Sequence, residues 1–180
     1  MRPSKLIMCA MMSILVLTGL FGLFASSVMA DDTLASFKGG IGVIPVSSGV
    51  GTLATAEVVN RNIVRGVQPA SQIWVIRKLE AEVKTNGHIK VGGEGLVLGG
   101  GNNVGRATGQ SVFATLICEA AAPFTERNSD LDGVPLDPNG DFDIDDVLTP
   151  APPTPCASPM LLIRNADGKN WFAAGILEQD

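Results

Sequence analysis

KLEAEVKTNGHIKV, residues 78–91, gives the clearest indication of the fold class. Leu79, Ala81 and Val83 alternate with charged residues, and the alternation resumes after Asn-Gly. This pattern is typical of a strand with one buried face, and Asn-Gly is typical of a hairpin turn. A helix competes over residues 72–84, where apolar residues also fall near helical spacing and Glu and Lys are good helix formers. The turn favours the strand, so we predict a long β-hairpin.

Short apolar runs predict further strands on both sides of this hairpin. They lie at residues 37–46, within 53–67, at 96–98, at 111–118, and at 160–164 and 171–177. The last two runs flank a second predicted turn, with Asp-Gly at its tip. In the first run, Pro45 indicates a bulge or an edge position. The run at 111–118 is apolar on both faces, as in a central strand. We therefore predict an all-β fold, an antiparallel β-sandwich or barrel-like single domain with long Gly/Pro-rich loops.

Residues 99–105, Gly-Gly-Gly-Asn-Asn-Val-Gly, are rich in glycine but do not match a phosphate-binding loop. A dinucleotide-binding loop is followed by a helix, and a Walker loop ends in Gly-Lys-Ser/Thr. The next run here is a predicted strand. The segment is therefore interpreted as a connection.

The N-terminus has the pattern of a secretory signal peptide, residues 1–30. Arg2 and Lys5 precede an apolar run over residues 6–24, and small residues lead to Ala30. This order is that of a cleaved export signal. The alternative is an uncleaved anchor, because the apolar run is just long enough to cross a bilayer. We expect cleavage after Ala30, no stable membrane insertion afterwards, and a secreted or periplasmic protein.

Size and charge limit the classes of partner. Residues 31–180 suffice for one domain that buries roughly 70% of its unfolded surface. Loss of two of the 13 basic residues with the signal leaves 11 against 18 acidic residues, a net charge of −7. Such a charge argues against nucleic acid or an anionic membrane surface as partner. The sequence does not identify any other partner.

Two cysteines, Cys118 and Cys156, remain after the predicted cleavage. In an oxidising compartment an even pair predicts a disulfide. A loop of this length would stabilise the fold by roughly 4 kcal/mol in the chain-entropy model. The alternative is a pair of buried free thiols.

The segment between these cysteines, residues 118–156, is an acidic and proline-rich excursion from the predicted scaffold. Between residues 126 and 146 it carries eight carboxylates and one basic residue, Arg127. We interpret residues 134–145 as an edge hairpin with Phe142 and Ile144 inward. Its outward row of aspartates would discourage aggregation between sheet edges.

A calcium site is the competing interpretation of the same aspartates. Its candidate ligands are Asp137, Asn139, Asp141 and Asp143. Over some twelve residues the spacing resembles an EF-hand or dockerin loop, which takes oxygen ligands at positions 1, 3 and 5. Phe142 stands at the position of the invariant glycine, and Leu148 at that of the bidentate glutamate. A true EF-hand is therefore excluded, a looser calcium site remains a hypothesis, and no other cofactor is expected.

No assembled catalytic set is visible in the sequence. His88 is the single histidine, and no Gly-x-Ser-x-Gly elbow is present. Glu94 with one of the aspartates could serve a glycosidase-like hydrolase, which is the alternative function. The small number of aromatic residues is unfavourable for a sugar site or a carbohydrate-binding module. We expect a non-catalytic binding or structural role outside the cytoplasm, with calcium-assisted binding through the excursion as a variant.

Overall fold

The computed structural model describes residues 32–45 and 62–179 of the chain. The predicted signal peptide, residues 1–30, lies outside these residues, as does most of the strand expected within 53–67. Residues 62–67 form a turn in which Val64 and Val67 exchange two backbone hydrogen bonds, so the strand prediction is wrong for this part. No described residue is helical, which confirms the all-β class and rejects the helix alternative at 72–84.

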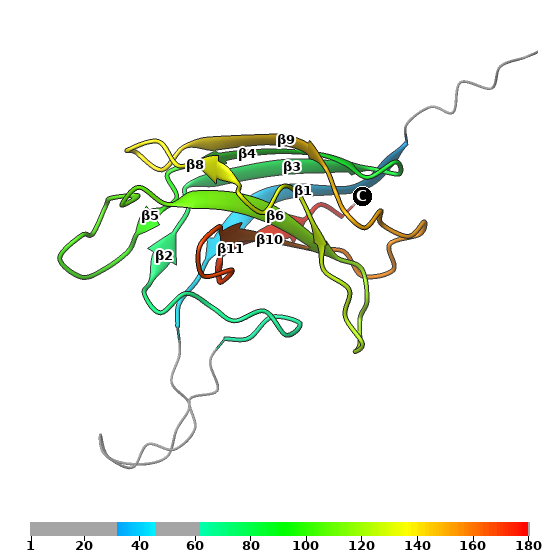
Figure 1. Cartoon of the computed structure of the whole chain (residues 1–180), viewed down its shortest axis with the longest axis horizontal. Coiled ribbons are helices and arrows are strands. Elements are labelled where there is room, and N and C mark those ends of the chain that lie inside the picture. Colours follow the sequence, from blue (N-terminus) through cyan, green and yellow to red (C-terminus); the bar gives the residue numbers. More distant parts are fainter. Residues whose placement is uncertain (1–31, 46–61, 180) are drawn as a thin grey trace, which may run out of the picture.

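The described part of the chain contains eleven strands (Figure 1). In chain order they are β1 (Thr33–Gly42), β2 (Trp74–Val75), β3 (Lys78–Lys84), β4 (His88–Glu94), β5 (Val97–Leu98), β6 (Ser111–Ile117), β7 (Arg127–Asn128), β8 (Val134–Pro135), β9 (Phe142–Val147), β10 (Met160–Asn165) and β11 (Trp171–Leu177). The two predicted hairpins, β3–β4 and β10–β11, are both present as antiparallel pairs.

Nine of these strands form one sheet in the order β7-β6-β10-β11-β1-β3-β4-β9, with β8 also paired to β6. The pairings between named strands are all antiparallel. β2 and β5 form a separate two-stranded sheet beside one end of the large one (Figure 1). The large sheet curves until its two ends approach each other, which gives a nearly closed, barrel-like fold.

The two ends of the sheet are joined by a short bridge. Asn128 in β7 and Thr149, just beyond β9, exchange backbone hydrogen bonds of 2.9 and 2.8 Å. Close by, the Asp130 backbone N–H donates to Asp146 Oδ2 at 2.6 Å. Pairing the ends satisfies backbone groups that an open sheet edge would leave exposed.

The core fills the inside of this curved sheet. Alternate residues of β3 and β4 point inward and are buried, among them Leu79, Val83 and Ile89, which are fully inaccessible to solvent. Residues of β6 are buried on both faces, as the sequence predicts for 111–118. The apolar residues that alternate along residues 78–91 thus form one side of the core.

The predicted edge hairpin at residues 134–145 is only partly right. Phe142 and Ile144 are buried while Asp143 and Asp145 are exposed, as expected. However, β8 pairs with β6 and β9 pairs with β4, so the two strands are not hydrogen-bonded partners. The excursion is therefore part of the barrel wall, because it completes the sheet instead of hanging from it.

The expected bulge also lies elsewhere. β1 ends at Gly42, and its pairing with β11 shifts register between Phe37 and Gly40, well before Pro45. Gly39 in this interval has a φ of 92°, a conformation that only glycine adopts readily. The bulge therefore lies at Gly39 and not at Pro45.

The predicted disulfide joins Cys118 to Cys156. Cys118 directly follows β6 and Cys156 precedes β10, and these strands are neighbours that pair Ile117 with Met160. The disulfide therefore holds the two ends of the excursion together where it leaves and rejoins the sheet. The cysteines are 38 positions apart in the sequence, and closing a loop of this length corresponds to a stabilisation of about 4 kcal/mol in the chain-entropy model.

Gly93 of β4 lies directly opposite Phe142 of β9. A Cβ atom on Gly93 would overlap the Phe142 ring, whereas one on Gly92, facing outward, would lie 3.5 Å from Asp143 Oδ1. Only glycine at position 93 lets the ring enter the core.

We predict that Gly93→Ala lowers the free energy of unfolding by about 1–3 kcal/mol, because it overpacks the core. Gly92→Ala on the same strand is the matched control and should change it by less than about 0.5 kcal/mol. Urea unfolding of both variants measures the difference. Equal effects of the two substitutions would contradict the inward position of Phe142.

Candidate functional site

The strongest candidate site is a hollow of about 310 Å³ at one end of the barrel. It lies where β10 ends and where β6 and β11 begin, next to the β2–β5 sheet and the loop over residues 99–110 (Figure 1). Barrel mouths are common places for small-molecule sites, which usually measure 300–1,000 Å³. We call this hollow the mouth pocket.

The apolar side of the mouth pocket is built around two stacked rings. Trp74 of β2 and Phe172 of β11 have ring centroids 4.0 Å apart and an interplanar angle of 12°. Each residue is only 4% exposed, and Leu98 and Ala70 complete this side. Gly42 lets β1 approach β2 here, because a Cβ at that position would overlap the Trp74 backbone. The rings therefore form a fixed wall with no open ring face.

The inner polar part of the mouth pocket consists of three amides, those of Gln110, Asn165 and Asn170. Asn165 is buried, donates from Nδ2 to Gln110 Oε1 at 3.3 Å, and accepts the Asn170 backbone N–H at 3.2 Å. These bonds fix the orientation of the Asn165 amide. Gln110 and Asn170 keep side-chain groups that can face a ligand.

The rim of the mouth pocket consists of four exposed polar side chains, those of Ser71, Gln72, Asn103 and Thr108. Within the described part of the chain, none of these four side chains makes a hydrogen bond to another residue. Each is therefore available as both donor and acceptor.

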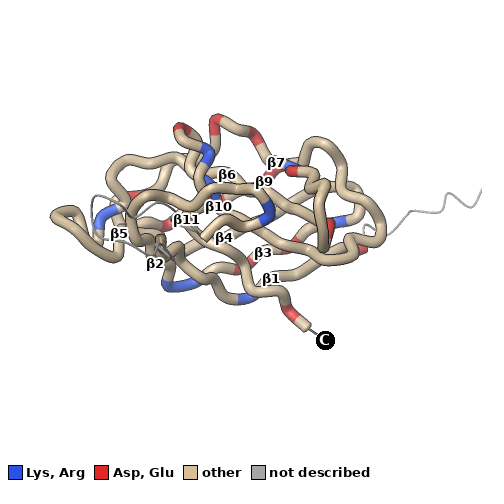
Figure 2. Tube along the Cα trace, turned by 90° about the horizontal axis from the view of Figure 1, so that it is seen from below, with Lys and Arg blue, Asp and Glu red and all other residues tan. Residues whose placement is uncertain are grey.

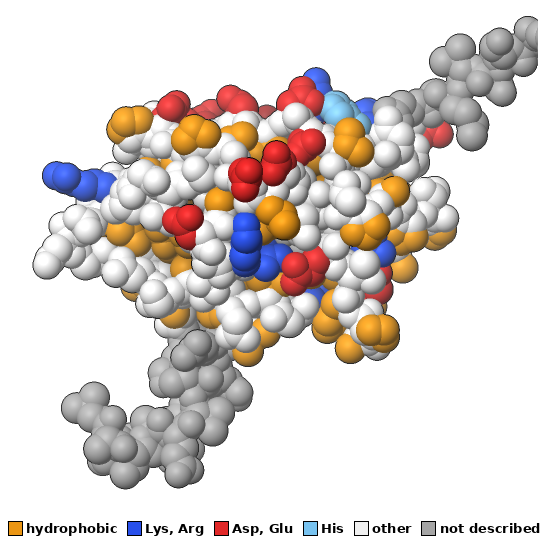
Figure 3. Space-filling model, in the orientation of Figure 1, with side chains coloured by type: hydrophobic (Ala, Val, Ile, Leu, Met, Phe, Trp, Pro, Cys, Tyr) orange, Lys and Arg blue, Asp and Glu red, His pale blue; other side chains and the backbone are white. Residues whose placement is uncertain are grey.

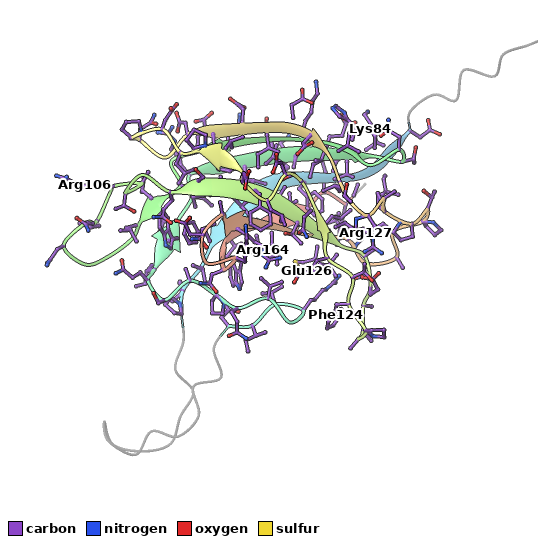
Figure 4. All side chains as sticks on the ribbon, viewed as in Figure 1. Lys84, Arg106, Phe124, Glu126, Arg127 and Arg164 are labelled. Atoms are coloured by element: carbon purple, nitrogen blue, oxygen red, sulfur yellow. A yellow bond between two sulfur atoms is a disulfide. The ribbon has the colours of Figure 1, made fainter. Side chains whose placement is uncertain are left out.

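The described residues that line the mouth pocket include no charged side chain. Arg106, although part of the neighbouring loop, extends away from the body of the protein (Figure 4). A charged ligand would find no counter-charge in this lining and would lose hydration on entry. The pocket therefore suits an uncharged ligand.

A second hollow, of about 450 Å³, lies on the outer face of β1, β3 and β4. Its charged residues are Lys38, Glu80, Glu82, Lys90 and Glu178. Charges of both signs are interspersed along this part of the trace (Figure 2). The glutamates on β3 form ion pairs, Glu80 with Lys78 at 3.3 Å and Glu82 with Lys84. Since these charges largely neutralise one another, the groove offers no strong field for a charged ligand.

The four calcium candidates lie around the turn between β8 and β9. Asp141 Oδ1 accepts the Gly95 backbone N–H at 2.9 Å, and its Oδ2 accepts the Asn139 amide at 2.7 Å. Asp137 closes the turn by accepting the Gly140 N–H at its carbonyl, and Asp143 lies opposite Gly92 on β4. Among the residues of the structure that are described, no group of three or more His, Cys, Asp or Glu side chains could hold a metal ion. Calcium binding stays a prediction.

The acidic side chains are spread in several groups over the upper part of the face shown in Figure 3. Asp145, on the outer face of β9, contacts His88 Nε2 at 2.6 Å and Lys90 Nζ at 3.3 Å. The hydrogen bond from His88, followed by that from Lys90, holds the pKa of Asp145 below its ordinary value. This aspartate thus has a structural partner.

Glu94, the candidate of the hydrolase alternative, forms ion pairs with Arg77 at 3.0 Å and Lys78 at 3.9 Å. No hydrogen bond among the described residues links it to another carboxyl group. A glycosidase places two carboxyl groups on either side of the scissile bond, whereas the contacts of Glu94 are with basic side chains. The hydrolase alternative gains no support from this geometry.

Two buried arginines form ion pairs that sequence reasoning missed. Arg127 donates to both carboxylate oxygens of Glu119, at 2.8 and 3.3 Å, and its Nε has no partner. Arg164 and Glu126 lie side by side in Figure 4, and Arg164 Nη1 donates to Glu126 Oε2 at 2.6 Å. The Arg164 guanidinium also lies 5.2 Å from the centre of the Phe113 ring. The Arg164–Glu126 pair links the excursion to β10, and the Arg127–Glu119 pair links β7 to the start of the excursion.

Comparison of the chain with protein-family models, with curated proteins and with solved structures finds no match. Within residues 32–45 and 62–179, no helix is long and apolar enough to cross a membrane.

Sequence reasoning did not find the mouth pocket, because its residues come from three separate parts of the chain, 70–74, 98–110 and 165–172. One signal was available: asparagine and glutamine recur in the predicted turns and loops of these segments. Their convergence depends on how β2 and β5 sit beside the barrel, which the pattern of a single strand does not encode.

The Arg127–Glu119 pair predicts how stability depends on pH. The hydrogen bond from Arg127 lowers the pKa of Glu119 to about 2. Stability from this group is therefore complete above pH 4.5 and lost as pH falls toward 2. We expect Glu119→Gln to lower the free energy of unfolding by about 1–3 kcal/mol at pH 7. Near pH 2 the variant and the wild type should have similar free energies of unfolding.

Denaturant unfolding of both proteins between pH 2 and pH 7 measures this difference. Glu178→Gln, at an exposed position without an ion pair among the described residues, is the control. A difference between wild type and Glu119→Gln that does not change with pH would contradict the assigned pKa shift.

Proposed function

We propose that the chain is an exported, disulfide-stapled β domain that binds a small uncharged ligand in the mouth pocket. The observation that carries this proposal is the composition of the pocket, seven uncharged hydrogen-bonding side chains beside an apolar wall. Small-molecule sites combine a concave apolar surface with a few polar groups that orient the ligand. The four rim side chains without partners are available for this role.

One feature of the sequence and one of the structure support export. Residues 1–30 have the charged start, apolar centre and small-residue end of a secretory signal. A disulfide such as Cys118–Cys156 persists mainly in oxidising compartments outside the cytoplasm. The proposal therefore places the mouth pocket in the periplasm or the extracellular medium.

Binding is favoured over catalysis by the chemistry of the same lining. General acid–base or nucleophilic catalysis needs a titratable or nucleophilic group whose pKa suits the reaction. The described lining offers amides and two hydroxyls, those of Ser71 and Thr108, with no base beside them in the lining. A ligand held there would be bound without being converted.

Nuclear magnetic resonance titration tests the proposal. The probes are three uncharged types, hexoses (glucose, galactose and mannose), N-acetylglycinamide and adenosine, each at millimolar concentration. We expect at least one type to shift the side-chain amide signals of Gln72, Asn103 and Gln110 and the indole signal of Trp74. The amides of Asn128 and Asn139, which lie outside the pocket, should stay unchanged.

Charged D-glucuronate is the comparison ligand, and it should bind more weakly than glucose because the lining has no counter-charge. If none of the uncharged probes shifts the pocket signals, or if glucuronate binds as well as they do, the proposed function is wrong.

A further inference from the structure

We infer that the ligand of the mouth pocket is a neutral carbohydrate, either a hexose or the end of a short oligosaccharide. This inference rests on the proposed function and specifies its ligand class. It depends on three properties of the pocket. Its free side chains can both donate and accept hydrogen bonds, the backbone N–H groups beside it already have partners, and the faces of its two aromatic rings are buried.

The free groups of the pocket both donate and accept hydrogen bonds. Gln72 and Asn103 each offer an NH₂ and a carbonyl oxygen, and Ser71 and Thr108 each offer a hydroxyl. A sugar hydroxyl likewise donates and accepts, so neighbouring hydroxyls match such a mixed lining without leaving groups unpaired. A site of this type discriminates strongly against analogues that lack the hydroxyl groups.

A peptide is a poorer match because the backbone beside the pocket is already hydrogen-bonded. Extended peptides add to exposed strand edges through main-chain hydrogen bonds. Here Trp74 N–H donates to Val43 O at 2.9 Å, Leu98 N–H to Arg106 O at 3.1 Å, and Gly99 N–H to Ile73 O at 2.9 Å. The two short strands that border the pocket therefore lack these donors for a peptide.

A nucleobase is also a poorer match. Bases are held by stacking on open aromatic faces. Trp74 and Phe172 instead stack on each other and are almost fully buried, so neither ring offers a free face. The lining also lacks the cationic side chains that would receive a phosphate.

The same aromatic pair explains why a low aromatic content does not exclude a sugar here. An open aromatic platform is one way to hold a sugar ring, and its absence makes the sequence unfavourable for that mode. In the mouth pocket the apolar contact comes from the small exposed part of Trp74 and Phe172 together with Leu98 and Ala70, and the amides orient the sugar. For a sugar of about twelve non-hydrogen atoms, ordinary ligand efficiency gives a Kd on the order of 1 mM.

The three types of probe, titrated separately into the full mature chain, test this inference. We expect one or more hexoses to shift the pocket signals with a millimolar Kd, and N-acetylglycinamide and adenosine to leave them unchanged. Asn103→Ala should weaken hexose binding about 3- to 10-fold, the value of one hydrogen bond. Asn102→Ala, at an exposed neighbour outside the lining, should not.

A second matched pair, Gln72→Ala against Gln68→Ala, repeats the comparison on the other side of the rim; both side chains are exposed, so both variants should fold. If adenosine or N-acetylglycinamide shifts the pocket and no hexose does, the carbohydrate inference is wrong while the binding function stands. If hexoses bind equally well to Asn103→Ala, the sugar lies elsewhere and the inference is also wrong. If no probe binds, both proposals are wrong.

Discussion

The structure depends on joining the two ends of one curved sheet. β9 pairs with β4 on one side, and Thr149 meets Asn128 of β7 on the other. Without this junction, backbone groups of β7 and β9 would be exposed, and the core that faces Phe142 and Ile144 would open to water. The acidic segment between the cysteines supplies both partners of the junction, and the disulfide holds its two ends on adjacent strands.

The mouth pocket follows from the same closure. β6, β10 and β11 are held side by side, so the residues at their ends converge at one end of the barrel. The small β2–β5 sheet covers that end and brings Trp74 against Phe172. Charged residues lie mainly on the outer faces of the strands, where they form ion pairs with one another. The pocket is therefore lined by neutral groups.

Much of the fold could be predicted from the sequence, because period-two alternation and turn residues act locally. Residues 78–91 specify a hairpin by themselves, and the even pair of cysteines predicted the disulfide on the expectation of export. The partners of β8 and β9 could not be predicted, since a strand pattern shows which face is buried and not which neighbour it joins. The pocket was missed for the same reason, and the ion pair of the buried Arg164 with Glu126 also depends on a long-range contact.

Amide hydrogen exchange tests most directly whether residues 142–149 belong to the barrel wall. The amides of Leu148 and Thr149 bond to Gly87 and Asn128, so they should be as protected as those of β3 and β4 and exchange through global unfolding. Exchange of residues 142–149 at the rate of an open loop, while β3 and β4 stay protected, would show that the segment is a flap and that the sheet is not closed.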